Sequence, residues 1–222
     1  MQDIIKQEQF EIEVLDKLNS KRFLNNLVFG GGSMLRLCFG LERFSADLDF
    51  WILKKIDTEK LFEDLKKWLS QFYTIRDAAQ KFHTLLFEIR SANYPRSLKI
   101  EIRKELKKIK TEQAIAYSKY SSTQVLLNVV SLKDMMSEKI KACLARKEIR
   151  DVYDMEFLLK KGLEFNVPPE SLVDILKVID SLKKKDYSVK LGALLEEEQR
   201  KYYINENFKI LRMAIADKTG KT

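Results

Sequence analysis

The sequence predicts an α+β protein: a mixed β-sheet flanked by helices in residues 1–125, and a helical lobe in residues 126–222 that closes a cleft over it. Three observations support this prediction. A strand, a glycine turn, a short helix and a second strand follow one another within residues 27–52. Two more strand-like segments come before residue 125, and from about residue 126 the apolar residues recur at helical spacing.

Residues 3–26 are expected to form the first helix, since apolar side chains recur there near helical spacing and Asp3 can cap its start. We expect this helix to pack on the sheet, and no residue in it is assigned to chemistry. The apolar run at residues 27–29 then indicates a buried strand, which Gly30 interrupts.

The glycine turn after this strand has the features of an anion-binding site. Gly31 and Gly32 precede Ser33, which is expected to open a helix of under two turns that Gly40 can close. A glycine-rich turn between a strand and a helix lets backbone N–H groups approach an anion, and the N-terminus of the helix favours negative charge. Gly31, Gly32 and Ser33 are therefore candidate phosphate-binding residues. The alternative is an ordinary tight turn.

The strand at residues 47–52 carries two carboxylates. Asp47 and Asp49 lie on the same face of this strand, because successive side chains point to opposite faces. Two adjacent acids repel each other, and a divalent cation is the simplest compensation. All-oxygen ligation suits Mg²⁺ or Mn²⁺. A phosphate-binding turn followed by a metal-binding acid pair predicts a metal–triphosphate site.

The next elements are a helix and a hairpin. Asp57 or Thr58 can cap a helix whose apolar stripe ends at Leu69. Residues 82–89 and 98–102 are predicted to be strands that pair as a hairpin. Glu101 points away from the apolar face of its strand and can face the two aspartates, whereas Glu88, in a similar FEIR context, is the rival.

The region after residue 126 is predicted to contain only helices and loops. One helix begins near Ser131, and Pro168 and Pro169 start another. Residues 171–217 are expected to supply two or three more, in which the aromatic residues pack. Asp154 is expected to hold Arg150 or Arg146 in a structural ion pair.

The composition restricts the kinds of function that are possible. The chain of 222 residues has a net charge of +8, and much of the excess lies in the basic segment 96–110. This segment is either a solvated face or a nucleic-acid surface. Two distant cysteines and one histidine, His83, argue against zinc sites and histidine-based triads. The sequence has no run of eighteen apolar residues, so we expect no membrane span. No signal peptide is evident, so a cytoplasmic location is expected.

The two motifs resemble a known enzyme family. The string GGS followed by D-L-D, at residues 31–33 and 47–49, is similar to the first motif of DNA polymerase β-type nucleotidyltransferases. The longer pattern GGS…G-x-x-R-x-S-x-D-L-D-F resembles the AbiEii/AbiGii toxins of that superfamily. A second characteristic pattern, E-K-h-x-A-x-x-x-R-x-x-x-R-D-x-Y-D, is matched without a gap by residues 138–154. The resemblance extends over about two thirds of the chain.

The resemblance implies a fold, an activity and a set of residues. It implies a nucleotidyltransferase-type sheet, transfer of NMP from an NTP, and Mg²⁺ (or Mn²⁺) held by Asp47, Asp49 and a third carboxylate, which matches Glu101. It also implies a functional Lys and Asp, carried over to Lys139 and Asp151. Lys139 would bind phosphates together with the glycine turn. Glu101, Asp49 or Asp151 could accept the proton of the attacking hydroxyl.

The resemblance further implies the toxin of a toxin–antitoxin pair, with a cognate antitoxin as a partner and RNA, plausibly tRNA, as acceptor. The basic segment 96–110 would suit an RNA backbone. Two other functions remain open. One is an enzyme that modifies a small molecule, such as an antibiotic, at the same metal site. The other is a non-catalytic module that only binds nucleotide.

Overall fold

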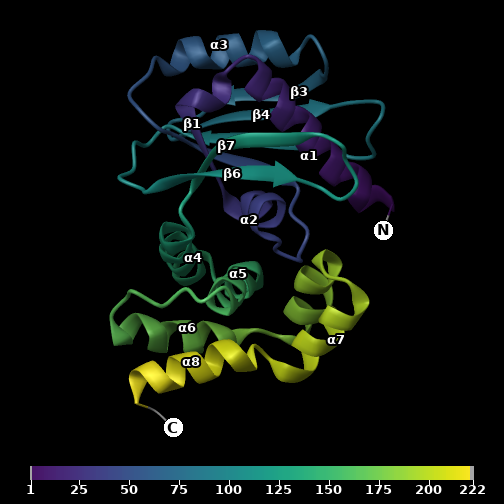
Figure 1. The fold of residues 1–222 in the computed structure, drawn as a ribbon. Coiled ribbons are helices and arrows are strands. Elements are labelled where there is room, and N and C mark those ends of the chain that lie inside the picture. Colours follow the sequence, from purple (N-terminus) through teal and green to yellow (C-terminus); the bar gives the residue numbers. More distant parts are fainter. Residues whose placement is uncertain (1, 221–222) are drawn as a thin grey trace. The chain divides into compact units, whose positions relative to one another are not determined.

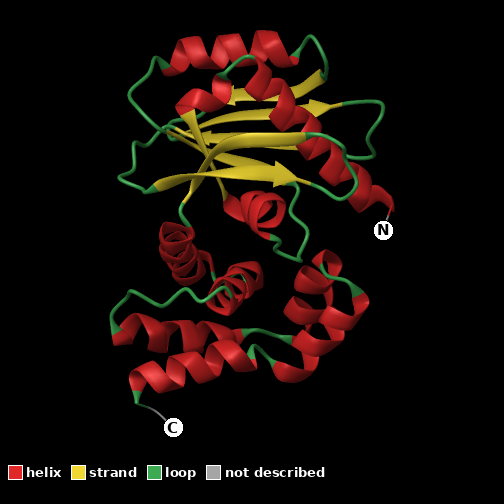
Figure 2. Cartoon of the chain, viewed as in Figure 1, coloured by secondary structure: helices red, strands yellow, loops and turns green. Residues whose placement is uncertain are grey.

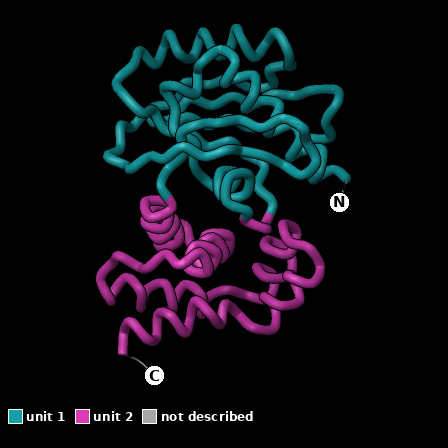
Figure 3. The backbone as a smooth tube through the Cα atoms, in the orientation of Figure 1, with its two compact units in different colours: residues 1–40, 44–131 teal, residues 41–43, 132–222 magenta. Residues whose placement is uncertain are grey.

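The computed structural model describes residues 2–220, which form two compact units (Figure 3). Unit 1 contains the residues up to Gly40 together with Phe44–Ser131, and unit 2 contains Leu41–Arg43 together with the residues from Leu132 onward. The expected boundary at residues 125/126 falls inside a strand, Gln124–Val130, and the division lies at Ser131/Leu132 instead. The tripeptide Leu41–Arg43, which lies between Phe39 and the strand that begins at Asp47, belongs to the helical unit 2.

Unit 1 is built on one mixed seven-stranded sheet with the order β3-β4-β5-β2-β1-β7-β6 (Figure 1). The pairs β2/β5 and β1/β7 are parallel, and the other neighbouring pairs are antiparallel. The strands are β1 Leu27–Gly30, β2 Asp47–Ile52, β3 Thr74–Gln80, β4 Thr84–Arg90, β5 Leu98–Arg103, β6 Thr111–Tyr117 and β7 Gln124–Val130.

Three helices flank this sheet: α1 Gln2–Ser20, α2 Gly31–Phe39 and α3 Thr58–Leu69. Figure 1 shows α1 and α3 on one side of the sheet and α2 on the other. The side under α3 is apolar, and the rings of Phe62 and Phe87 stack there with centroids 4.9 Å apart. The predicted α+β class, with a mixed sheet between helices, is confirmed for this unit.

Several local expectations hold, and others need correction. The strands β1 and β2 and the Asp57 cap of α3 form as predicted. The β4/β5 hairpin also forms, but β4 begins at Thr84, so Phe82 and His83 lie in the turn before it rather than in the strand. The first helix stops at Ser20, because Arg22 is left-handed (φ 61°) and a short 3₁₀ turn follows. Helix α2 begins at Gly31 rather than Ser33, and its nine residues exceed two turns.

The prediction of helix from residue 126 was wrong at its start. Strand β7 occupies Gln124–Val130, where it pairs with β6 and with β1, Phe29 lying opposite Val129. Strands β3 and β6 were not predicted either. The near-continuous apolar run of β7 fits a helix or a buried strand equally well, so only its partners in the sheet decide between them.

Unit 2 contains only helices and loops in its described residues (Figure 2). Its longer helices are α4 Leu132–Arg146, α5 Ile149–Lys160, α6 Pro169–Ser181, α7 Glu197–Glu206 and α8 Lys209–Thr219, with a π-helix at Asp186–Leu191 and a 3₁₀ turn at Gly192–Leu194. Tyr203 packs in its core against Tyr153 and Phe208, as expected for an aromatic residue of this region. No helix within residues 2–220 is long and apolar enough to cross a membrane.

Candidate active site

The three predicted metal-binding acids lie on one face of two neighbouring strands. In the parallel β2/β5 pair Asp49 is opposite Glu101, and Asp47 is opposite Lys99. Side chains alternate along each strand, so Asp47, Asp49 and Glu101 all project on the same side. All three are half-buried, whereas Leu48 and Phe50 on the other side are fully buried. The register therefore brings the three acids together along adjacent strands.

The rival acid, Glu88, occupies the same face but a more distant strand. It lies on β4 opposite Lys99, and the residue of β4 opposite Glu101 is Leu86. Because β5 separates β4 from β2, Glu88 is one strand farther from Asp49 than Glu101 is. The sequence favoured Glu101 with Glu88 as its rival, and in the strand order Glu101 is the one that lies next to β2.

The glycine turn packs directly against Asp49. Gly31 opens α2 with φ +74°, and a Cβ atom placed on it would lie 2.2 Å from Oδ2 of Asp49. A side chain at position 31 would therefore be strained and would collide with the carboxylate. Gly30 is also constrained, since a Cβ there would lie 1.7 Å from the ring of Trp51. The glycines thus allow the start of α2 to approach the acidic face.

Ser33 holds the start of β2 against α2. Its hydroxyl is buried and donates to the backbone carbonyl of Asp47 at 2.6 Å. This hydrogen bond positions the first predicted metal ligand. It also means that the Ser33 hydroxyl proton is already used, so backbone N–H groups at the start of α2 are the donors best suited to phosphate.

The donor set fits a hard divalent cation in its chemistry. Three carboxylates from adjacent strands, about 4.8 Å apart, supply oxygen ligands of the kind that Mg²⁺ and Mn²⁺ prefer. Within residues 2–220, no three His, Cys, Asp or Glu side chains are grouped closely enough to hold a metal ion in their present rotamers.

Cations and an indole surround the acids on this face. Lys99 and Arg103 are exposed on either side of Glu101 along β5. The Arg103 guanidinium lies 5.3 Å from the ring centroid of Trp51, which is buried two residues beyond Asp49. The indole N–H of Trp51 is buried and has no hydrogen-bond partner in the described residues. Sequence reasoning did not select Trp51, although its position on the same face as Asp49 follows from strand alternation.

Sequence reasoning also missed buried charge on α1. Glu8 accepts hydrogen bonds from Arg36 of α2 and from the hydroxyl of Ser118. Glu11 is fully buried, and neither of its carboxylate oxygens has a partner in the described part of the chain. Burial raises the pKa of Glu11 well above its ordinary value, and the negative charges of Glu8 and Asp47 raise it further, against the opposing effect of Arg36. Helix α1 therefore places an acid within electrostatic reach of Asp47.

The residues carried over from the second motif form a buried ion cluster in unit 2. Arg43 donates from Nε to Oδ1 of Asp154 at 2.5 Å and from Nη2 to Oδ2 at 2.6 Å. Lys139 Nζ lies 2.6 Å from Asp154 and 3.6 Å from Asp151. Arg146 donates to both oxygens of Asp151 at 2.6 Å. Lys139 and Asp151 are thus held in one network, and both are buried.

The partner of Asp154 differs from the expected one. Asp154 is held by Arg43, 111 residues away in the sequence, and by Lys139, rather than by Arg150 or Arg146. Burial alone would raise the pKa of Asp154, but the charges of Arg43 and Lys139 outweigh burial and lower it below its ordinary value. Asp154 is therefore negatively charged at neutral pH and pairs with the Lys139 ammonium.

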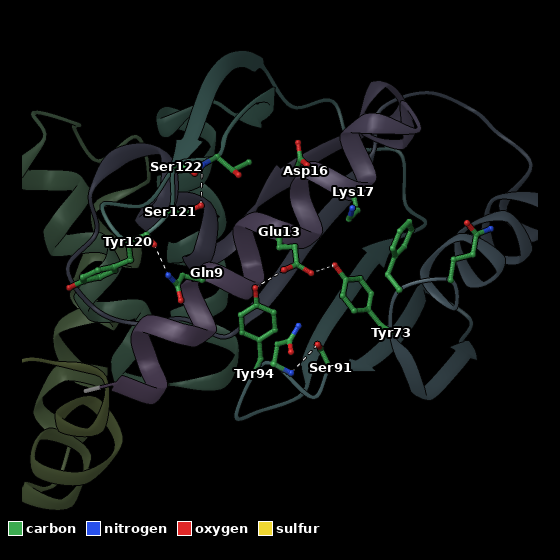
Figure 4. A pocket seen from close by; sticks show the side chains of 14 residues that line it. Gln9, Glu13, Asp16, Lys17, Tyr73, Ser91, Tyr94, Tyr120, Ser121 and Ser122 are labelled. Atoms are coloured by element: carbon green, nitrogen blue, oxygen red, sulfur yellow. Dashed lines mark hydrogen bonds between the residues drawn. The ribbon is translucent and has the colours of Figure 1, made fainter.

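A polar hollow of about 810 Å³ lies in unit 1 beside α1 (Figure 4). The hydroxyls of Tyr73 and Tyr94 both donate to the carboxylate of Glu13 there, at 2.8 Å and 2.6 Å. Burial, and then these bonds to Glu13, raise the pKa of each tyrosine. None of the predicted site residues lines this hollow, so it is separate from the acidic face.

Comparison with known proteins identifies a family and a fold. The family model described as "Nucleotidyl transferase AbiEii toxin, Type IV TA system" matches residues 13–215. A structure described as a nucleotidyltransferase from H. pylori is similar with a TM-score of 0.61 and 22% identity, covering 96% of both chains. JHP933 from Helicobacter pylori gives 0.58 and 21%, covering 95% of this chain and 94% of that one.

A third similar structure is MenT4, a nucleotidyltransferase toxin from Mycobacterium tuberculosis. Its TM-score is 0.61 at 17% identity, and the match covers 95% of this chain and 84% of that chain. No curated protein sequence matches the chain. At these identities the solved structures establish the fold, and the expected nucleotidyltransferase-type architecture is confirmed.

Proposed function

We propose, because this chain belongs to the AbiEii family of nucleotidyltransferase toxins of type IV toxin–antitoxin systems, that it moves an NMP from an NTP to a hydroxyl of RNA in a Mg²⁺-dependent (or Mn²⁺-dependent) reaction. The observation that carries the proposal is the acidic face of unit 1. Asp49 lies opposite Glu101 in register, beside Asp47, and packs against the Gly31 turn at the start of α2.

Each group on this face has a proposed task. Asp47, Asp49 and Glu101 would hold the metal ion, and the N–H groups of Gly32 and Ser33 would bind the triphosphate at the start of α2. When bound, the metal ion neutralises phosphate charge and acts as a Lewis acid. Catalysis of this type depends mainly on positioning and charge stabilisation.

The proposed reaction is an in-line displacement. An oxygen of the acceptor attacks the α-phosphorus, the bond from that phosphorus to the bridging oxygen breaks, and pyrophosphate leaves. A carboxylate accepts the hydroxyl proton. Both oxygens of Asp151 accept hydrogen bonds from Arg146, and Asp151 is fully buried. These contacts favour Glu101 or Asp49 for the proton and give Asp151 the task of holding Lys139, the proposed phosphate-binding cation of unit 2.

The test of the proposed chemistry is transfer of label from α-labelled nucleotides. Wild-type protein is incubated with each of four NTPs, Mg²⁺ or Mn²⁺, and total RNA that includes tRNA. We expect label in RNA and at least about a hundredfold loss in Asp49→Asn, since one charged metal ligand is removed. Asp64→Asn, an exposed acid on α3, is the matched control. Label on an added antibiotic but not on RNA would replace the proposed acceptor, and no transfer with any nucleotide would contradict the chemistry.

The proposed acceptor surface is the basic segment 96–110. Reversing Lys104, Lys107 and Lys108 to glutamate should weaken RNA binding and flatten its dependence on salt, because fewer counterions are released. The matched control reverses three exposed lysines of α3, namely Lys60, Lys66 and Lys67. Equal binding by both triple variants at several salt concentrations would exclude this surface.

The proposed cellular partner is a cognate antitoxin. Expression of the wild-type chain should slow growth, and the Asp49→Asn chain should not, if nucleotidyl transfer is the toxic activity. A co-expressed product of a neighbouring gene that restores growth in cells expressing the wild-type chain would be identified as the antitoxin. Growth inhibition that persists in the Asp49→Asn variant would separate toxicity from this site.

A further inference from the structure

The turn between β3 and β4 carries an unusually exposed aromatic side chain. Phe82 is 88% exposed, and the next most exposed large apolar side chain in residues 2–220, Met213, is 58% exposed. The ring of His83 meets it edge to face, with centroids 4.5 Å apart and planes at 90°. An apolar ring costs free energy in water, and turns usually carry small polar residues. The contact with His83 supports one side of the ring and leaves most of its surface open.

Cationic side chains lie in this turn and in the loop bonded to it. The N–H of Lys104 donates to the carbonyl of His83 at 2.9 Å, so the start of the basic loop after β5 lies beside the turn. Arg103 is opposite Thr84 in the β4/β5 register, and Lys81 belongs to the turn itself. Lys108, farther along the same loop, is also exposed. An exposed ring among cations has the chemistry that binds single-stranded nucleic acid, since bases stack on the ring and phosphates pair with the cations.

The distance from this turn to the acidic face suits a nucleic-acid end. Glu101 and Lys104 are three residues apart at the end of β5, which corresponds to roughly 10 Å at the rise of a strand. This length equals about three stacked nucleotides at about 3.4 Å each. An RNA chain whose bases contact Phe82 can therefore place its terminal hydroxyl near Asp49 and Glu101 without leaving unit 1.

We propose that Phe82 is a stacking platform for the single-stranded end of the acceptor RNA, and that Arg103, Lys104 and Lys108 hold the adjacent phosphates. This inference rests on the proposed function for the identity of the acceptor. It adds a contact with the bases that the basic segment alone does not provide. It assigns the β3/β4 turn to substrate binding, a role that neither the motifs nor the acidic face indicates.

The test measures RNA binding in the absence of nucleotide, by fluorescence anisotropy of a labelled single-stranded oligoribonucleotide of about twelve residues. We expect Phe82→Ala to weaken binding about tenfold and Phe82→Trp to bind at least as tightly as wild type, because stacking tolerates any aromatic ring. Tyr117→Ala, which removes a 54% exposed ring on β6, is the matched control and should stay within about twofold.

Dependence on salt separates stacking from charge. Phe82→Ala removes no cation, so its salt slope should equal that of wild type, whereas the Lys104→Glu/Lys108→Glu variant should have a smaller slope. Unchanged binding by Phe82→Ala, an equal loss in Tyr117→Ala, or no RNA binding by wild type would each overturn the platform. If wild type labels RNA and Phe82→Ala labels it equally well, the platform fails alone. If Phe82 supports binding but RNA is never labelled, only the proposed function fails.

Discussion

Replacing Asp154 by asparagine tests the ion cluster of unit 2. The carboxylate has no exposed surface and compensates Arg43 and Lys139, whose side chains are only 4% and 8% exposed. Asparagine keeps the shape but removes the charge, so two buried cations lose their shared anion. Asp151 cannot replace it, because it lies 3.6 Å from Lys139 and already pairs with Arg146.

The expected loss in the free energy of unfolding is about 3–5 kcal/mol, the usual cost of breaking a buried ion pair on one side. With a urea m-value of about 2 kcal/mol/M, the midpoint of unfolding should fall by about 2 M. Asp174→Asn, which removes the anion of an exposed pair with Lys177 at 2.8 Å, should cost no more than about 0.5 kcal/mol.

The dependence on pH provides a second check. The folded pKa of Asp154 is below its ordinary value, so its contribution is complete above the unfolded pKa of about 3.9 and is lost as pH falls through the folded pKa. The difference between wild type and Asp154→Asn should therefore be constant near neutral pH and shrink in acid. A midpoint shift no larger than that of Asp174→Asn would refute the assignment of a buried, compensated charge.

Three further substitutions give distinct results. Gly31→Ala should lower both thermal stability and nucleotidyl transfer, since φ is +74° and the new Cβ would meet Asp49; normal activity and melting temperature would show that the turn relaxes. Glu11→Gln should be more stable than wild type, by a margin that widens as pH rises. The pKa of Glu11 is raised in the folded protein, so its contribution to the free energy of unfolding is lost as pH increases through that pKa. Calorimetry between about pH 5 and 9 would contradict this if the difference in stability did not depend on pH. Asp57→Ala should cost about 1 kcal/mol in urea unfolding, because its side chain caps α3 at the N–H groups of Glu59 and Lys60; an unchanged midpoint would argue against the cap.

The parts of the fold that depend on local chemistry could be predicted from the sequence. The glycine turn, strand β2 and the Asp57 cap each follow from residues within a few positions of one another. Strand β3 (TIRDAAQ) and edge strand β6 (TEQAIAY) have weak alternation, and their neighbours in the sheet determine their structure.

The same division applies to the candidate site. Alternation along one strand placed Asp47 and Asp49 on a common face, and sequence context favoured Glu101 over Glu88. Which of the two glutamates lies on the strand next to β2 follows only from the parallel pairing of β2 with β5. The pair between Arg43 and Asp154 joins positions 111 residues apart, and no local pattern indicates it. Long-range pairing of this kind is decided by packing of the whole unit rather than by any short segment.

The grouping of Leu41–Arg43 with the helical unit has a practical meaning for protein engineering. The polypeptide crosses between the units three times, at positions 40/41, 43/44 and 131/132. A fragment that began at Leu132 would contain Asp154 without its arginine, and a fragment that ended at Ser131 would contain Arg43 without its carboxylate. Chimaeras that exchange the helical portion between relatives should therefore also transplant the tripeptide at 41–43.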